Sequence, residues 1–147
     1  MTRRRLTATL AALAIAATLG ACSSTETAGL AEVPVASAAP TAGAELTATD
    51  FAAALKRPGT TVIDVRTPAE FAEGHLANAV NIDVQAPDFA TKIAGLDPAG
   101  TYAVYCRSGN RSAAALSAMS AAGFTHLYHL GGGIGAWQEA GGQVVTG

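Results

Sequence analysis

Residues 101–121 read TYAVYCRSGNRSAAALSAMSA, and this stretch decides the fold. Its first part, Tyr102–Tyr105, is an apolar run typical of a buried strand. Its last part predicts a helix over Ser112–Ala122, because Ala115, Leu116, Met119 and Ala122 recur at helical spacing. The polar segment CRSGNRS joins the two, so Cys106 stands at the carboxyl end of a strand. Ligand sites of α/β domains lie at such ends.

The CRSGNRS loop favours a thiolate at Cys106. A helix start and inward-pointing loop amides attract an anion, and Gly109 tolerates the positive φ that this arrangement needs. Arg107 and Arg111 add positive charge, which lowers the pKa of a nearby cysteine. We therefore predict a nucleophilic Cys106 and a substrate-binding loop made of Arg107, Ser108, Gly109, Asn110, Arg111 and Ser112.

A structural role for Cys106 is the alternative, because free cysteines are most often small side chains of the core. The two arginines, the glycine and the polar flanks of the loop argue against apolar surroundings for Cys106. An exposed, functional thiol is therefore expected.

Three motifs of the chain resemble those of the single-domain rhodaneses, which carry sulfur as a cysteine persulfide. CRSGNRS resembles their active-site loop, DVRTPAEFAEGHLANAVNI (Asp64–Ile82) their N-terminal signature, and HLGGGIGAW (His129–Trp137) their closing turn and helix. The resemblance covers Leu46–Val145. It implies a rhodanese-like three-layer α/β domain, with a mostly parallel sheet and helices on both faces.

The resemblance also implies a function. A thiosulfate:cyanide-type sulfurtransferase would take sulfane sulfur from a small anionic donor, thiosulfate or a persulfide, onto Cys106 and pass it to a thiol or cyanide. The family needs no cofactor for this reaction. A non-catalytic module that carries sulfur or binds a protein partner would have the same sequence pattern.

A Cdc25-like cysteine phosphatase is a further alternative. In this chain four residues separate Cys106 from Arg111, whereas the phosphatase loop is longer, since a tetrahedral phosphate needs more donors. The reaction would also need a general acid, for which Asp64 and Asp83 are the candidates. Sulfur transfer is favoured over phosphate hydrolysis.

The N-terminus predicts export. Residues 1–21 begin with a basic region of three arginines and continue as an apolar region too short for a comfortable membrane span, which is typical of a signal peptide. LGAC, Leu19–Cys22, resembles the bacterial lipobox, and this implies lipidation of Cys22 and a cell-membrane anchor on the extracytoplasmic face. Ordinary cleavage near Ala36–Ala38 is the alternative, but it leaves Cys22 without a purpose.

We expect a lipidated cysteine and flexible linker over residues 22–44, rich in small residues, and one folded domain over 45–147. Loss of the signal peptide leaves six basic and eleven acidic residues, a formal charge of −5. This charge disfavours nucleic acid and anionic lipid surfaces as partners. Contact with a membrane is thus expected only through the lipid.

Further strands are predicted at Thr61–Val65, Ala79–Ile82 and His126–Leu130. Thr67, Pro68 and Glu70 form a capping-box start for a short helix that stops at Gly74. The glycines of Gly131–Ala136 match a dinucleotide fingerprint, but too little chain follows for a second βαβ half, so a turn before the last helix is expected.

Two other groups of polar residues receive structural predictions. Arg66 is expected to pair with Asp64 or Glu70 rather than bind substrate. The three histidines have no spacing that suggests a shared metal, and each is expected to be a structural residue.

Overall fold

The computed structural model describes residues 40–147 of the chain. The predicted signal peptide, Cys22 and the linker up to residue 39 lie outside the described residues. None of the helices in residues 40–147 is long and apolar enough to cross a membrane.

Strands and helices alternate along the described chain. Their bounds are β1 (Ala44–Leu46), α1 (Ala48–Leu55), β2 (Thr60–Asp64), α2 (Pro68–Glu73), β3 (Val80–Asn81), α3 (Phe89–Ala94), β4 (Thr101–Tyr105), α4 (Asn110–Ala121), β5 (His126–Leu130) and α5 (Gly133–Glu139). The predicted strands correspond to β2 to β5, with ends that differ by at most one residue. Strand β1 and helices α1 and α3 were not predicted from the sequence.

All neighbouring strands of the sheet pair in parallel, in the order β1-β5-β4-β2-β3. Strand β4 lies at the centre, and it pairs with β2 over its whole length, from Thr101 opposite Thr60 to Tyr105 opposite Asp64. The two edges are the shortest strands, β1 and β3. The predicted parallel α/β sheet is confirmed.

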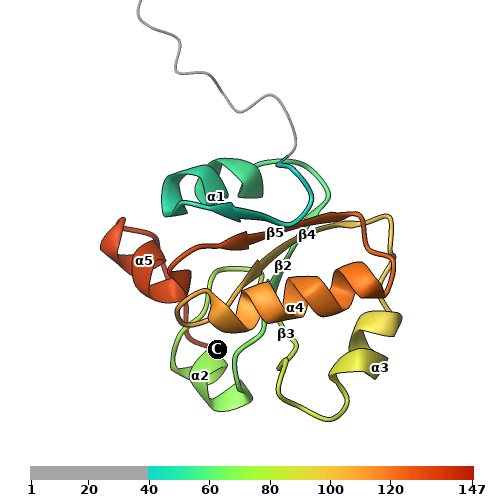
Figure 1. Ribbon diagram of the computed structural model, residues 1–147. Coiled ribbons are helices and arrows are strands. Elements are labelled where there is room, and N and C mark those ends of the chain that lie inside the picture. The colour runs from blue at the N-terminus through green and yellow to red at the C-terminus, as the bar shows by residue number, and fades with distance from the viewer. Residues whose placement is uncertain (1–39) are drawn as a thin grey trace, which may run out of the picture. The chain divides into compact units, whose positions relative to one another are not determined.

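Helices cover both faces of the sheet (Figure 1). On one face α3 and α4 pack against side chains such as Val104 and Leu127. On the other face α1 and α5 pack against the neighbours of these residues along the strands, such as Tyr105 and Tyr128. Strands β2, β4 and β5 thus contribute to two apolar cores, as expected for strands that are buried on both sides.

The N-terminal strand extends the sheet beyond the predicted domain boundary. Strand β1 begins at Ala44, and the Gly43 amide just before it donates a hydrogen bond of 2.7 Å to the Leu127 carbonyl. Ala44 and Leu46 pack against the core on the α1 side of the sheet. Strand β1 therefore begins at the last residue of the expected linker.

Helix α2 has the start that its sequence predicts. Thr67 and Glu70 form a reciprocal capping box, and Pro68 is in the first turn. Helix α4 begins earlier than predicted, at Asn110, because Gly109 has a φ of 97° and lets the chain turn into the helix directly after the loop. The cysteine loop is therefore short.

Candidate active site

Cys106 follows directly after β4, at the carboxyl end of the central strand. Its exposed fraction is 0%, and its side chain belongs to the apolar core beneath α4. The expectation of an exposed thiol outside apolar surroundings is wrong. Side chains alternate along a strand, so Cys106 points to the same side as Val104, toward α4.

The loop after Cys106 folds around the sulfur. The Gly109 amide donates a hydrogen bond of 3.1 Å to Sγ, and the first turn of α4 starts at the next residue. A side chain at Gly109 would be strained at this φ, and its Cβ would lie 3.3 Å from the Gly132 nitrogen. The close approach of loop amides to the sulfur therefore depends on this glycine.

These surroundings shift the pKa of Cys106. Burial raises it, but the hydrogen-bond donors that the thiolate finds in the Ser112 hydroxyl and in the amides of Ser112, Ser108 and Gly109 outweigh burial and hold the pKa below its usual value. Hydrogen bonding is the main cause of the lowered pKa, and the charge of Arg111 attracts the thiolate in addition. The loop thus favours an anionic sulfur.

The two loop arginines differ in their surroundings. The Arg111 guanidinium forms two hydrogen bonds with the Glu70 carboxylate, of 2.8 and 2.7 Å, so its charge is largely compensated. Arg107 is exposed, and no carboxylate among residues 40–147 pairs with it. Arg107 is therefore the loop cation that is available to an incoming anion.

The predicted ion pair of Arg66 forms with Asp64. The two side chains are buried and joined by a contact of 2.6 Å, and Arg66 also donates a bond of 2.7 Å to the Gly74 carbonyl. Asp64 is held by this pair and has no exposed surface. It is thus unsuited to act as the general acid of a phosphatase.

The glycine-rich turn before α5 packs against the cysteine loop. The Ile134 amide donates a bond of 2.8 Å to the Cys106 carbonyl, and a Cβ at Gly133 would clash with that carbonyl and with Arg107. The turn was predicted, but this contact was not. The signal in the sequence was the run of three glycines, since only glycine permits such a close approach.

The three histidines lie in different places. His129 Nδ1 is 3.1 Å from the Ser112 hydroxyl, His75 stacks on Phe71, and His126 is exposed. Within residues 40–147 no three His, Cys, Asp or Glu side chains converge as metal ligands would. The contact of His129 with the loop was not foreseen.

A cleft of about 470 Å³ opens beside the loop. It is lined by Arg66, Glu70, Glu73, Gly74, Arg107, Ser108, Ile134, Gly135, Gln138 and Val144. Arg107 and Ser108 of the cysteine loop form one rim of this cleft, whereas Cys106 is not among its lining residues. Since Cys106 itself has no exposed surface, a reactant reaches its sulfur only when residues that cover it move.

Comparison with protein families and curated proteins gives one consistent result. The family model of the rhodanese-like domain matches residues 47–140. The probable adenylyltransferase/sulfurtransferase MoeZ of Mycobacterium tuberculosis is 41% identical over 78 residues, 53% of this chain and 20% of that protein. Thiosulfate sulfurtransferase 16 of Arabidopsis thaliana is 34% identical over 89 residues, 54% of this chain and 74% of that protein. The chain therefore spans about a fifth of MoeZ but most of the shorter relative.

Solved structures give the same fold. A rhodanese-related protein from Thermoplasma volcanium superposes with a TM-score of 0.63 at 36% identity, covering 71% of this chain and 99% of that one. A rhodanese-like domain protein from Staphylococcus aureus superposes with a TM-score of 0.57 at 25% identity, covering 64% of this chain and 90% of that one.

Proposed function

Because the chain belongs to the rhodanese-like domain family, we propose that it transfers sulfane sulfur through a persulfide on Cys106. One observation carries the proposal: Sγ accepts the Gly109 amide in a loop whose hydrogen bonds lower the pKa of Cys106. Relatives named as thiosulfate sulfurtransferases support the same chemistry. The donor is thiosulfate or a persulfide, and the acceptor is a thiol or cyanide.

The reaction proceeds in two displacements. The Cys106 thiolate attacks the outer sulfur of thiosulfate, a new sulfur–sulfur bond forms, and sulfite leaves with the electron pair of the broken bond. A thiolate or cyanide then attacks the outer sulfur of the persulfide. The Cys106 thiolate leaves and is ready for the next donor, so no external oxidant or reductant is needed.

The loop residues have separate roles in this scheme. The amides of Ser108, Gly109 and Ser112 stabilise negative charge on the sulfur in both displacements. Arg107, exposed at the rim, attracts the anionic donor. Arg111 acts indirectly, since its pair with Glu70 fixes the start of α4 against α2.

Intact-mass measurement tests the proposal. The full chain is incubated with thiosulfate beside the Cys106→Ser variant, and we expect the mass of one added sulfur atom in the wild type alone. Cyanide should remove this mass. A mass gain that persists in the serine variant, or no gain with thiosulfate and with a low-molecular-weight persulfide, contradicts persulfide formation on Cys106.

The full burial of Cys106 favours a second candidate, a module that carries sulfur for a protein partner without fast turnover. A covered persulfide is protected from small thiols and is released only when the residues that cover it move. Steady-state thiosulfate:cyanide assays separate the two candidates. An enzyme turns over many times per Cys106, whereas a carrier loads one sulfur and then stops.

We further propose that the protein is an extracytoplasmic lipoprotein, anchored through lipid on Cys22. Support comes from the basic and apolar regions of residues 1–21 and from LGAC at Leu19–Cys22. Cys22→Ala should abolish labelling by a fatty-acid analogue and move the protein out of the bacterial membrane fraction. Cys106→Ser is the matched control and should remain labelled. Equal labelling of both variants would exclude the anchor.

A further inference from the structure

Ser112 links the cysteine loop to a buried histidine. Its hydroxyl oxygen is 2.8 Å from the Gly109 carbonyl and 3.1 Å from His129 Nδ1, and both Ser112 and His129 are buried. The Gly109 residue that accepts from Ser112 also donates its amide to the Cys106 sulfur. Hydrogen bonds through Ser112 and Gly109 therefore connect His129 to Cys106.

The protonation of His129 decides where the single proton of this hydroxyl goes. A hydroxyl that donates to the Gly109 carbonyl, as the 2.8 Å distance indicates, has no proton left for the ring. Nδ1 must then carry a proton and donate to the Ser112 oxygen. The opposite tautomer would draw the hydroxyl proton toward the ring and away from the loop.

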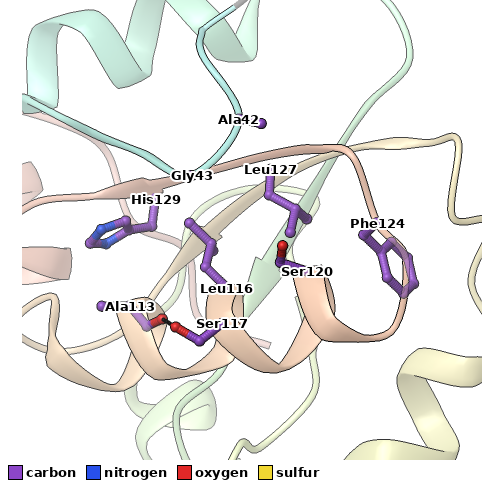
Figure 2. A pocket seen from close by; sticks show the side chains of 9 residues that line it. All are labelled: Ala42, Gly43, Ala113, Leu116, Ser117, Ser120, Phe124, Leu127 and His129. Carbon is purple, nitrogen blue, oxygen red and sulfur yellow. Dashed lines mark hydrogen bonds between the residues drawn. The ribbon is translucent and has the colours of Figure 1, made fainter.

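His129 also lines a separate pocket. Figure 2 shows this pocket, which His129 and Leu127 of β5 line together with Ala113, Leu116 and neighbouring residues of α4. Nε2 lies 3.6 Å from the carboxylate of Glu45 on β1. Among residues 40–147, Glu45 is the ion-pair partner of His129. Burial lowers the pKa of His129, and Glu45 only partly offsets this, so the ring is neutral near neutral pH.

We propose that His129 is a positioning residue for Cys106, whose Nδ1 donates to Ser112 and so leaves the hydroxyl proton available to the sulfur. As long as the sulfur is neutral, the hydroxyl bonds the Gly109 carbonyl. Once the sulfur is anionic, the hydroxyl turns to it, and the bond from Nδ1 is kept in both arrangements. Donation by Nδ1 also polarises the hydroxyl and makes it a better donor.

This inference deepens the proposed role of Cys106, but its test needs no sulfur donor. The full chain is titrated with acid and base while the ultraviolet absorbance of the thiolate is recorded, and the trace of Cys106→Ser is subtracted. The subtraction removes the contribution of Cys22. Burial raises the pKa values of Tyr102, Tyr105 and Tyr128, which moves phenolate absorbance away from the thiolate signal.

His129→Leu should raise the titration midpoint of Cys106 by roughly half to one pH unit, as expected for the loss of one buried hydrogen bond. His129→Asn keeps a donor near the position of Nδ1 and should restore most of the shift. In a Ser112→Ala background, His129→Leu should add no further shift, because the path through the hydroxyl is absent.

Three outcomes would overturn the inference: no shift with His129→Leu, an equal shift in the Ser112→Ala background, or a midpoint for His129→Asn that equals that of His129→Leu. Thermal unfolding of each variant is measured in parallel. If His129→Leu does not fold, His129→Gln replaces it, since its amide lies one methylene further from the backbone. A midpoint for His129→Gln equal to that of His129→Asn would then contradict the role of Nδ1.

Discussion

At the scale of single residues, the two loop arginines are expected to behave differently on mutation. Arg107→Ala should raise the KM for thiosulfate about tenfold and change kcat little, because it removes an exposed, uncompensated charge that attracts the donor. Steady-state sulfur transfer measures both constants. Lys56→Ala, which removes an exposed charge from the opposite end of the sheet, is the control and should leave KM unchanged. A KM unaffected by Arg107→Ala would exclude donor binding by this residue.

At the scale of elements, Glu70 joins α2 to α4 through Arg111, and this bond makes stability dependent on pH. The two hydrogen bonds from Arg111 lower the pKa of Glu70 to about 2, against about 4.3 in an unfolded chain. Because the folded value is the lower one, the contribution is fully present above the unfolded pKa and is lost as pH falls toward about 2.

Glu70→Gln should therefore lower the free energy of unfolding by about 2 kcal/mol at neutral pH. This value already takes into account that the pair is partly exposed, since solvent screens its charges. Glutamine can still complete the capping box of α2, so the change isolates the charge. Urea denaturation at a series of pH values is the measurement. The difference in the free energy of unfolding between wild type and variant should disappear as the pH falls below about 4. A difference that does not change with pH would argue that it does not come from this ion pair.

The same elements show what could be predicted from sequence. Strands β2, β4 and β5 were found because their apolar residues are continuous, and α2 because its capping box is local. Strand β1 has three residues and no pattern of its own. Helix α1 did carry a signal that was not used, Thr47 followed three residues later by Asp50, and in the structure Thr47 is its N-cap.

The candidate site was predictable where its residues are close in sequence. The loop and its cysteine were recognised, but the contacts that support them join distant segments, such as Ser112 with His129 and Arg111 with Glu70. Such contacts depend on strand order and on the position of α2 near the start of α4, which periodicity does not specify. The burial of Cys106 was not predicted, because the polar residues that follow it suggested exposed surroundings. Side chains alternate along β4, and this alternation places Cys106 on the same side as the buried Val104.

At the scale of the whole domain, the two cores should unfold together. Phe51 has no exposed surface and contacts Tyr128 and Trp137 edge to face, on the side of the sheet away from Cys106. Phe51→Ala should lower the free energy of unfolding by about 3 to 5 kcal/mol. Strands β4 and β5 belong to both cores. In urea, the loading of Cys106 with sulfur and the helical circular dichroism of the protein should therefore be lost at the same concentration. Loss of loading at a lower concentration would mean that the loop unfolds separately.

The order of the strands limits how well copies of the domain can associate through the edges of their sheets. The sheet ends in β1, with three residues, and β3, with two, while its long strands lie inside. A second chain that added itself to either edge would gain few main-chain hydrogen bonds. Many copies of the domain can therefore be packed at high local concentration without growing into continuous intermolecular sheets.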